Sequence, residues 1–153
     1  MMNSYQKKTY HRVFFWFFFS LFVCFYPMII SIYVFFPLFI GVMGYLFIYG
    51  VENKQPIYVL WAFIYMVNLE LNLSLPIFLM ITSSLLFYLL FYFLVLKLEI
   101  CKVCKALLSI VLLDFIYLGL LFGFDFVFQT QSIILDKLLL YSLFLDMLVV
   151  VVL

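Results

Sequence analysis

The sequence predicts an all-α, polytopic integral membrane protein with about six transmembrane helices and both termini in the cytoplasm. Three observations lead to this fold class. First, 71% of the 153 residues are hydrophobic and only 10% are charged, whereas soluble domains are about half apolar and about a quarter charged. Second, short polar segments separate long apolar runs. Third, the cationic residues gather on one side of the predicted membrane. No linker or internal repeat divides the chain, so residues 1–153 are expected to form a single transmembrane domain.

The first apolar run covers residues 13–49 and contains no charge. A bilayer core needs about 20 helical residues, so the run is too long for one span and short for two. Pro27 and Pro37 are expected to break it, because proline removes a backbone donor and clashes with the preceding turn. We therefore expect helices over 13–27 and 37–50, with the piece between them near the interface. One tilted helix plus a re-entrant piece would instead give five spans in all.

Three polar segments mark the remaining spans. They read GVENKQP (50–56), KLEICKVCK (97–105) and DFVFQTQSIILDK (125–137). A fourth interruption, NLELNLSLP (68–76), separates two further apolar runs. The expected spans are therefore 57–69, 76–96, 106–124 and 138–153.

The distribution of cationic residues tests this count. In a six-span chain all Lys and Arg residues except Lys137 share one side of the membrane. They are Lys7, Lys8, Arg12, Lys54, Lys97, Lys102 and Lys105. An excess of Lys and Arg marks the cytoplasmic side, so we expect a multi-pass protein of a bacterial inner membrane, in contact with lipid. The net charge of +1 provides no basic surface for nucleic acid.

Two carboxylates are expected at membrane depth. Asp114 lies in the middle of the span 106–124, and Asp146 lies midway along the span 138–153. An ionised carboxylate costs several kcal/mol in such a position, so both must face protein or a wet cavity. They could form a proton or cation site, or each could be a hydrogen-bonding peg that fixes helix packing. No Lys, Arg or His occurs in another span, which favours the peg.

The segment NLELNLSLP is the other anomaly. Asn68, Glu70 and Asn72 alternate with leucines, and a period of two favours an extended strand over a helix. Extended backbone below the membrane surface needs protein or a cavity to satisfy its polar groups. We expect these residues to line a pocket, to dock a partner strand, or to form an ordinary interfacial loop.

The pair Cys101 and Cys104 forms a Cys-x-x-Cys motif. Such a pair can supply half of a zinc site or act as a redox dithiol. A zinc site needs four ligands, and only His11 is expected on the same side. That side is the reducing cytosol, so free thiols are the expected state. No nucleotide-binding glycine loop or hydrolytic triad is present, and the sequence predicts no catalytic residue, metal or cofactor.

With the spans assigned, the order of features resembles the bacterial rod-shape-determining protein MreD family. The segment YVFFPLF (33–39) is similar to the family's entry into its second helix, and WAFIYMVNLELNLSLPIFLMITSSLLFYLLF (61–91) is similar to its acidic residue, polar break and following helix. The segment LLSIVLLDFIYLGLLF (107–122) resembles its penultimate helix with a mid-span Asp. In this chain Asn68 stands where the family's break usually has Asp, and no glycine occurs between Gly50 and Gly119.

The resemblance implies a non-enzymatic role in cell-wall elongation and rod shape. The partners that it implies are an MreC-like scaffold, an MreB-like filament, and a RodA-type glycosyltransferase with its transpeptidase. The family is also similar in fold to vitamin-binding transporter subunits. A substrate-binding subunit of a small-molecule transporter is therefore the alternative function, with a pocket built on the segment 68–76 and Asp114. A redox protein built on Cys101 and Cys104 is the third.

Overall fold

The structure is a computed structural model that describes residues 4–33, 36–97, 101–129 and 141–149. Every regular element in these ranges is a helix, and no strand occurs within them, which confirms the all-α prediction. The helices are α1 (Ser4–Ile32), α2 (Ile40–Glu52), α3 (Pro56–Asn72), α4 (Leu79–Leu90), α5 (Tyr92–Lys97) and α6 (Lys102–Phe128), followed by a helical segment over 141–149.

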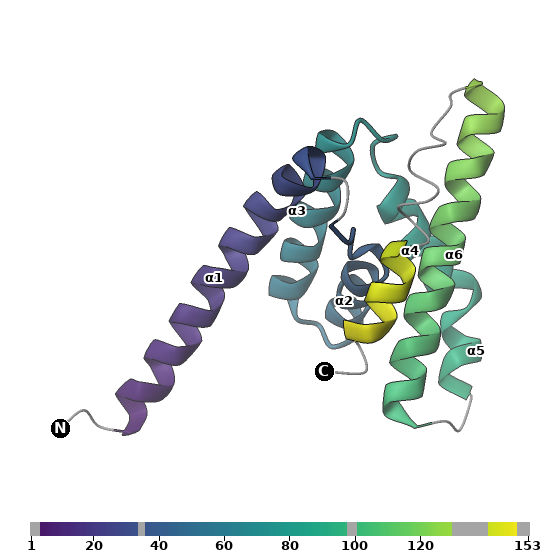
Figure 1. Ribbon diagram of the computed structural model, residues 1–153. Helices are drawn as coiled ribbons and strands as arrows, with labels where there is room; N and C mark the ends of the chain where they lie inside the picture. Colours follow the sequence, from purple (N-terminus) through teal and green to yellow (C-terminus); the bar gives the residue numbers. More distant parts are fainter. Residues whose placement is uncertain (1–3, 34–35, 98–100, 130–140, 150–153) are drawn as a thin grey trace.

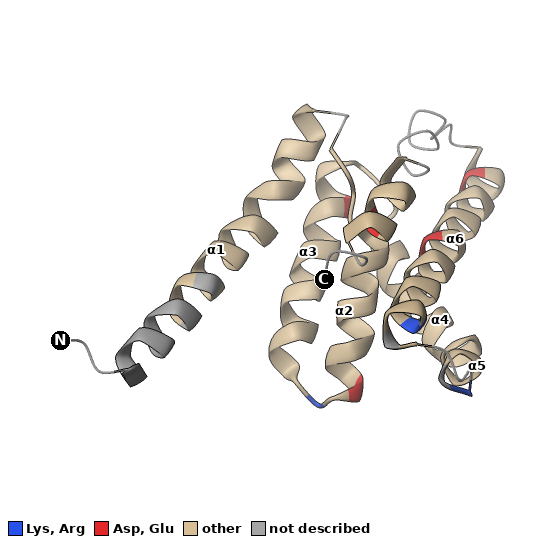
Figure 2. Cartoon of the chain, turned by 60° about the horizontal axis from the view of Figure 1, so that its bottom comes forward, with Lys and Arg blue, Asp and Glu red and all other residues tan. Residues whose placement is uncertain are grey.

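Successive helices run alternately in opposite directions, except that α5 continues from α4 (Figure 1). The central helix is α2, which packs against α3, α4 and α6, while α1 packs against α3 and leans away from the bundle toward its N-terminal end (Figure 1). The helix 141–149 runs parallel to α2, because Ser142 bonds to Leu38 and Asp146 bonds to Gly41. The lysines drawn in Figure 2 lie toward one end of the bundle, at the α2–α3 turn and near α5 and the start of α6.

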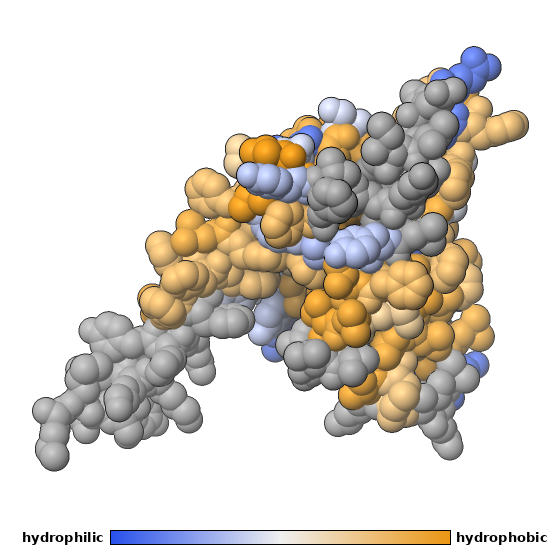
Figure 3. Space-filling view, in the orientation of Figure 1, coloured by the Kyte–Doolittle hydropathy of each residue, from blue (hydrophilic) through white to orange (hydrophobic). Residues whose placement is uncertain are grey.

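The core and the exterior of the bundle are both apolar. Met43, Met66 and Tyr117 are among the side chains buried between α2, α3 and α6, and much of the outer surface is hydrophobic as well (Figure 3). Phe126 on α6, for example, is 88% exposed. Exposed apolar surface on this scale marks a membrane or protein contact.

One helix among the described residues is long and apolar enough to cross a membrane. It is the 26-residue stretch Val103–Phe128 of α6, which is about 39 Å long at about 1.5 Å per residue. Shorter apolar helices cover Trp16–Ile32, Ile40–Glu52 and Leu79–Leu90. The predicted span 106–124 is thus extended at both ends. The predicted span 138–153 is described only over 141–149, and its other residues lie outside the described part of the chain.

The first predicted helix boundary is wrong, because α1 continues through Pro27 to Ile32. Proline at position 27 cannot donate to the carbonyl group of Val23, one turn earlier. The side-chain amide of Asn68 on α3 donates to Val23 O at 3.3 Å and to Cys24 O at 2.9 Å. A neighbouring helix thus supplies the donor that proline removes, which is a common way to keep an interrupted helix intact in a membrane.

The predicted extended segment is also wrong, because α3 remains helical through Asn72. Asn72 donates to both the backbone and side-chain oxygens of Asn68, one turn earlier, at 2.8 Å each. The alternation of polar residues with leucines led to the wrong prediction because the exterior of the bundle is apolar too. Leu71 is 58% exposed while its neighbour Glu70 is fully buried, so polarity does not report which face is inside.

The predicted helix over 76–96 starts later and is kinked. It begins at Leu79 as α4, and Phe91 separates α4 from α5. The backbone N–H of Val95 nevertheless donates to Phe91 O at 3.0 Å. The two elements therefore form one bent rod that runs back along α6.

Candidate functional site: buried carboxylates at two helix starts

Two helices begin after similar local sequences. Pro37-Leu38-Phe39 precedes α2, and Pro76-Ile77-Phe78 precedes α4. In each case the phenylalanine has a left-handed backbone, with φ of 50° at Phe39 and 71° at Phe78. The first N–H groups of any helix lack partners within the helix. Leu38, Ile40 and Gly41 at the start of α2 are buried, as are Leu79 and Met80 at the start of α4, whereas Phe78 is 52% exposed. Other parts of the chain must therefore satisfy them.

At the start of α4 one carboxylate does this. Glu70 of α3 is fully buried, and its two oxygens accept hydrogen bonds from the N–H groups of Phe78 and Met80 at 2.6 Å each. The carboxylate also lies at the positive end of the α4 dipole, where a negative charge is favourable. Glu70 thus acts as the N-terminal cap of a helix that begins nine residues later.

At the start of α2 the caps come from the distant helix 141–149. Ser142 Oγ accepts a hydrogen bond from Leu38 N at 3.0 Å, and Asp146 Oδ2 accepts one from Gly41 N at 3.0 Å. Ser142 and Asp146 are four residues apart, so they lie on one face of their helix. This face closes over the first turn of α2.

A second carboxylate, Asp114 of α6, reaches the same turn. A Cβ atom built on Gly41 would lie 2.8 and 2.9 Å from the two Asp114 oxygens, and 2.5 Å from Ile110 Cγ2. Glycine is therefore required for α6 to approach α2 at this point. Asp114 is 5% exposed and Asp146 is fully buried. Within the described part of the chain, Asp114 Oδ2 and Asp146 Oδ1 have no hydrogen-bond partner.

The carbonyl groups of the turn before α2 are also satisfied by side chains. Tyr26 of α1 donates to Pro37 O at 2.9 Å, and Tyr65 of α3 donates to Leu38 O at 2.8 Å. Together with Asp114 and Asp146, these tyrosines bring four helices to the residues 37–41, which comprise the non-helical turn and the first residues of α2. Such convergence is what irregular backbone needs where water is excluded.

The structure brings some of the sequence-predicted site residues together and separates others. Asp114 and Asp146 meet at Gly41, although 31 residues of chain separate them. Asn68 donates to α1 and accepts a hydrogen bond from Asn72, while Glu70 accepts hydrogen bonds from the start of α4. These three residues therefore have structural partners within the chain.

Sequence reasoning missed the residues that complete the α2 start, which are Gly41, Ser142, Tyr26 and Tyr65. It also missed the short structural repeat. The signal was present as Pro-Leu-Phe at 37–39 and Pro-Ile-Phe at 76–78. Three residues of hydrophobic sequence are too few to recognise as a repeat without their shared left-handed turn.

The Cys-x-x-Cys pair lies at the start of α6, and it differs from its expected state. Cys101 and Cys104 form a disulfide, with their Cα atoms 5.2 Å apart. Residues three apart at a helix start come within the range that a disulfide can bridge. The described residues contain no group of three His, Cys, Asp or Glu side chains that could hold a metal ion. The side chain of His11 lies outside the described residues, and Cys24 is a free, exposed thiol on α1.

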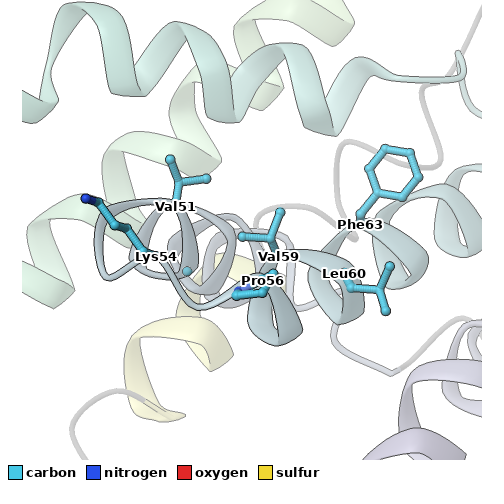
Figure 4. A pocket seen from close by; sticks show the side chains of 7 residues that line it. Val51, Lys54, Pro56, Val59, Leu60 and Phe63 are labelled. Atoms are coloured by element: carbon cyan, nitrogen blue, oxygen red, sulfur yellow. The ribbon is translucent and has the colours of Figure 1, made fainter.

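A shallow groove of about 420 Å³ lies beside the α2–α3 turn (Figure 4). Val51, Val59, Leu60 and Phe63 line it, and Lys54 lies at one end. The lining offers no pair of acid and base groups, so the groove has the character of a surface for hydrocarbon and not of a reaction centre.

Comparisons of this chain with family models, with curated proteins and with solved structures found no match.

Proposed function

We propose that the chain is a multi-pass membrane protein in which α1, α2, α3, the α4–α5 rod, α6 and the region of helix 141–149 each cross the bilayer. The alternating helix directions support this proposal (Figure 1). So do the apolar exterior and the length of α6. The lysines at the α2–α3 turn and near α5 gather toward one end (Figure 2), as the cytoplasmic side of an inner membrane requires.

We further propose that the protein is a non-catalytic scaffold of the MreD type, which supports cell-wall elongation by binding other membrane proteins. The observation that carries this proposal is the use of the buried carboxylates. Glu70 and Asp146 bond to the first N–H groups of α4 and α2. Their chemistry is thus directed at the chain's own backbone, as expected of residues that fix a shape for partners to recognise.

The sequence resemblance supports the choice of partners. The mid-span Asp, here Asp114, resembles the MreD family, whereas Asn68 stands where that family's polar break usually has Asp, and Glu70 follows two residues later. Asp114 lies at the start of α2 and Glu70 at the start of α4. The proposed partners are an MreC-like scaffold, an MreB-like filament, and a RodA-type glycosyltransferase with its transpeptidase, reached through lipid-facing or loop surfaces.

Depletion of the protein in its native host, with cell shape followed by microscopy, tests this role. We expect rods to swell and become round, and wild-type protein supplied in trans to restore them. A tagged copy should co-purify with the MreC-like scaffold. Glu70→Ala should fail to restore shape because it loses the α4 cap, whereas Glu52→Ala, an exposed carboxylate at the end of α2, should succeed. Unchanged cell shape on depletion would refute the proposal.

The alternative is a substrate-binding subunit of a transporter, and the paired interrupted helices favour it. In many transporters the N-termini of broken helices face the substrate near the bilayer midplane. Here side-chain carboxylates occupy both N-termini, which is why we rank this function second. Native mass spectrometry of the protein in mild detergent distinguishes the two. A bound small molecule, lost on Glu70→Gln or Asn72→Ala, would establish the transporter function over the scaffold.

A further inference from the structure

The two interior helix starts have the same sequence pattern but differ in the number of carboxylates. The α4 start has Glu70, and both oxygens of Glu70 accept an N–H. The α2 start has Asp146 and Asp114, and each of them keeps one buried oxygen without a partner within the described part of the chain. One carboxylate is sufficient to cap a helix, as α4 demonstrates. The second carboxylate at α2 therefore needs another explanation.

Electrostatics limits the charge that this site can hold. The N-terminus of a helix carries roughly half a positive charge, which can balance part of one carboxylate but not two. Two carboxylates that share a water-poor site do not both remain ionised. Because both Asp114 and Asp146 lie against Gly41, the second negative charge would have to be neutralised.

We propose that Asp114 and Asp146 form a proton-binding site that holds one proton between them at neutral pH. The pair then carries a single negative charge directed at the first turn of α2. Asp146 keeps the charge, because it accepts the Gly41 N–H. Asp114 holds the proton and donates it to Asp146. One hydrogen bond of this kind gives partners to the two oxygens that otherwise lack them.

Among the residues that the structure describes, the side chains around the pair supply no competing charge. Tyr26 of α1 and Tyr65 of α3 lie near Asp146, and their hydroxyl groups already donate to Pro37 O and Leu38 O. On α6 the nearest cation in sequence, Lys105, precedes Asp114 by nine residues, or about 13 Å along the helix axis. The helix 141–149 adds Tyr141, which lies near Tyr26, and α4 has no charged residue.

A metal cation fits this site less well than a proton. The backbone groups that point at the pair are N–H donors from the start of α2. A cation needs oxygen ligands, and it would meet the positive end of the α2 dipole. A proton needs two acceptor oxygens, and the site provides them.

Infrared spectroscopy of the whole protein in detergent, after labelling of aspartate with ¹³C at the side-chain carboxyl, tests the proposal without a variant. At neutral pH we expect a carbonyl band from one protonated, ¹³C-shifted aspartate per chain. Asp114→Asn should abolish the band, because the amide imitates the protonated acid and leaves Asp146 ionised. Glu52→Gln, at an exposed carboxylate, should leave it unchanged. The absence of this band from the wild type would overturn the proposal, and so would its persistence in Asp114→Asn.

Thermal unfolding supplies an independent readout. The folded protein holds a proton that the unfolded chain releases at neutral pH, so stability should fall as pH rises. Asp114→Asn should remove this part of the pH dependence while the protein stays folded, and Asp114→Ala should lower the midpoint at every pH. A thermal-unfolding midpoint that rises with sodium concentration only in the wild type would show that the site binds a cation, and it would overturn the proposal of a proton-binding site.

Discussion

At the scale of single residues, the two interior turns place a bulky side chain in a conformation that usually favours glycine. Phe39 and Phe78 both have positive φ, which costs of the order of 1–2 kcal/mol for a residue with a Cβ. Hydrogen bonds from neighbouring helices offset this conformational cost at Phe39. Side chains from α1, α3 and helix 141–149 bond to Pro37, Leu38 and Gly41. Strain at a phenylalanine is therefore a sign that the turn is held by its neighbours.

The residue that permits this convergence is Gly41, and Gly41→Ala tests it. A Cβ at this position would come within 2.5 Å of Ile110 and 2.8 Å of Asp114, so these two side chains, or α6 with them, would have to move away from α2. We expect the free energy of unfolding in detergent to fall by about 1–3 kcal/mol, as overpacking usually costs.

Gly119→Ala on α6 is the matched control for Gly41→Ala. No atom lies within 4 Å of a Cβ added there, and alanine favours a helix over glycine by about 1 kcal/mol. We therefore expect unchanged or higher stability. If Gly41→Ala proves as harmless as this control, then Asp114 does not pack on the first turn of α2.

At the scale of elements, the sequence prediction was wrong about where α1 ends. Proline normally ends or kinks a helix, yet α1 runs past Pro27 for five residues. The donor that Pro27 lacks comes from Asn68, which bonds to Val23 O and Cys24 O. The continuity of α1 is thus a property of the α1–α3 pair and not of α1 alone.

A double-mutant cycle measures this dependence. Asn68→Leu should lower the free energy of unfolding by about 1–3 kcal/mol, because it leaves the Val23 carbonyl unpaired in an apolar interface. Pro27→Ala restores a backbone donor for that carbonyl, so in its background Asn68→Leu should cost less, with a coupling of about 0.5–2 kcal/mol.

Asn53, whose exposed amide donates to Tyr49 O at the end of α2, provides the control for the cycle. Asn53→Leu and Pro27→Ala should be additive. Equal coupling of both asparagines to Pro27 would show that proline acts on global stability and not through the Asn68 contact.

Some features of these helices could be predicted from the sequence, and others could not. The helical class and the centres of α2, α3 and α6 followed from apolar runs between polar turns. The helical conformation of Asn68, Glu70 and Asn72 did not, because Leu71 faces outward while Glu70 faces inward. A chain whose exterior is as apolar as its core loses the polarity contrast on which periodicity depends. Asp114 and Asp146 were recognisable as buried, but their meeting at Gly41 depends on contacts between helices far apart in the sequence.

At the scale of the whole molecule, the alternating helix directions predict which turns lie on each side of the membrane. The α2–α3 turn and the α3–α4 turn lie at opposite ends of α3, which is 17 residues long, or about 26 Å. Lys54 belongs to the first turn, and the second turn contains no cation. In the proposed six-span topology, the positive-inside rule therefore predicts a cytoplasmic first turn and a periplasmic second turn.

Labelling of single cysteines tests this arrangement. Gln55 and Ser74 are both exposed, one in each turn, so each can be changed to cysteine in a chain whose three native cysteines are replaced by serine. We expect a membrane-impermeant maleimide to label Ser74→Cys in intact spheroplasts, and to label Gln55→Cys only after the membrane is opened. Inverted vesicles should reverse the result. Labelling of both positions from one face would mean that α3 does not cross the bilayer, and the six-span proposal would then fail.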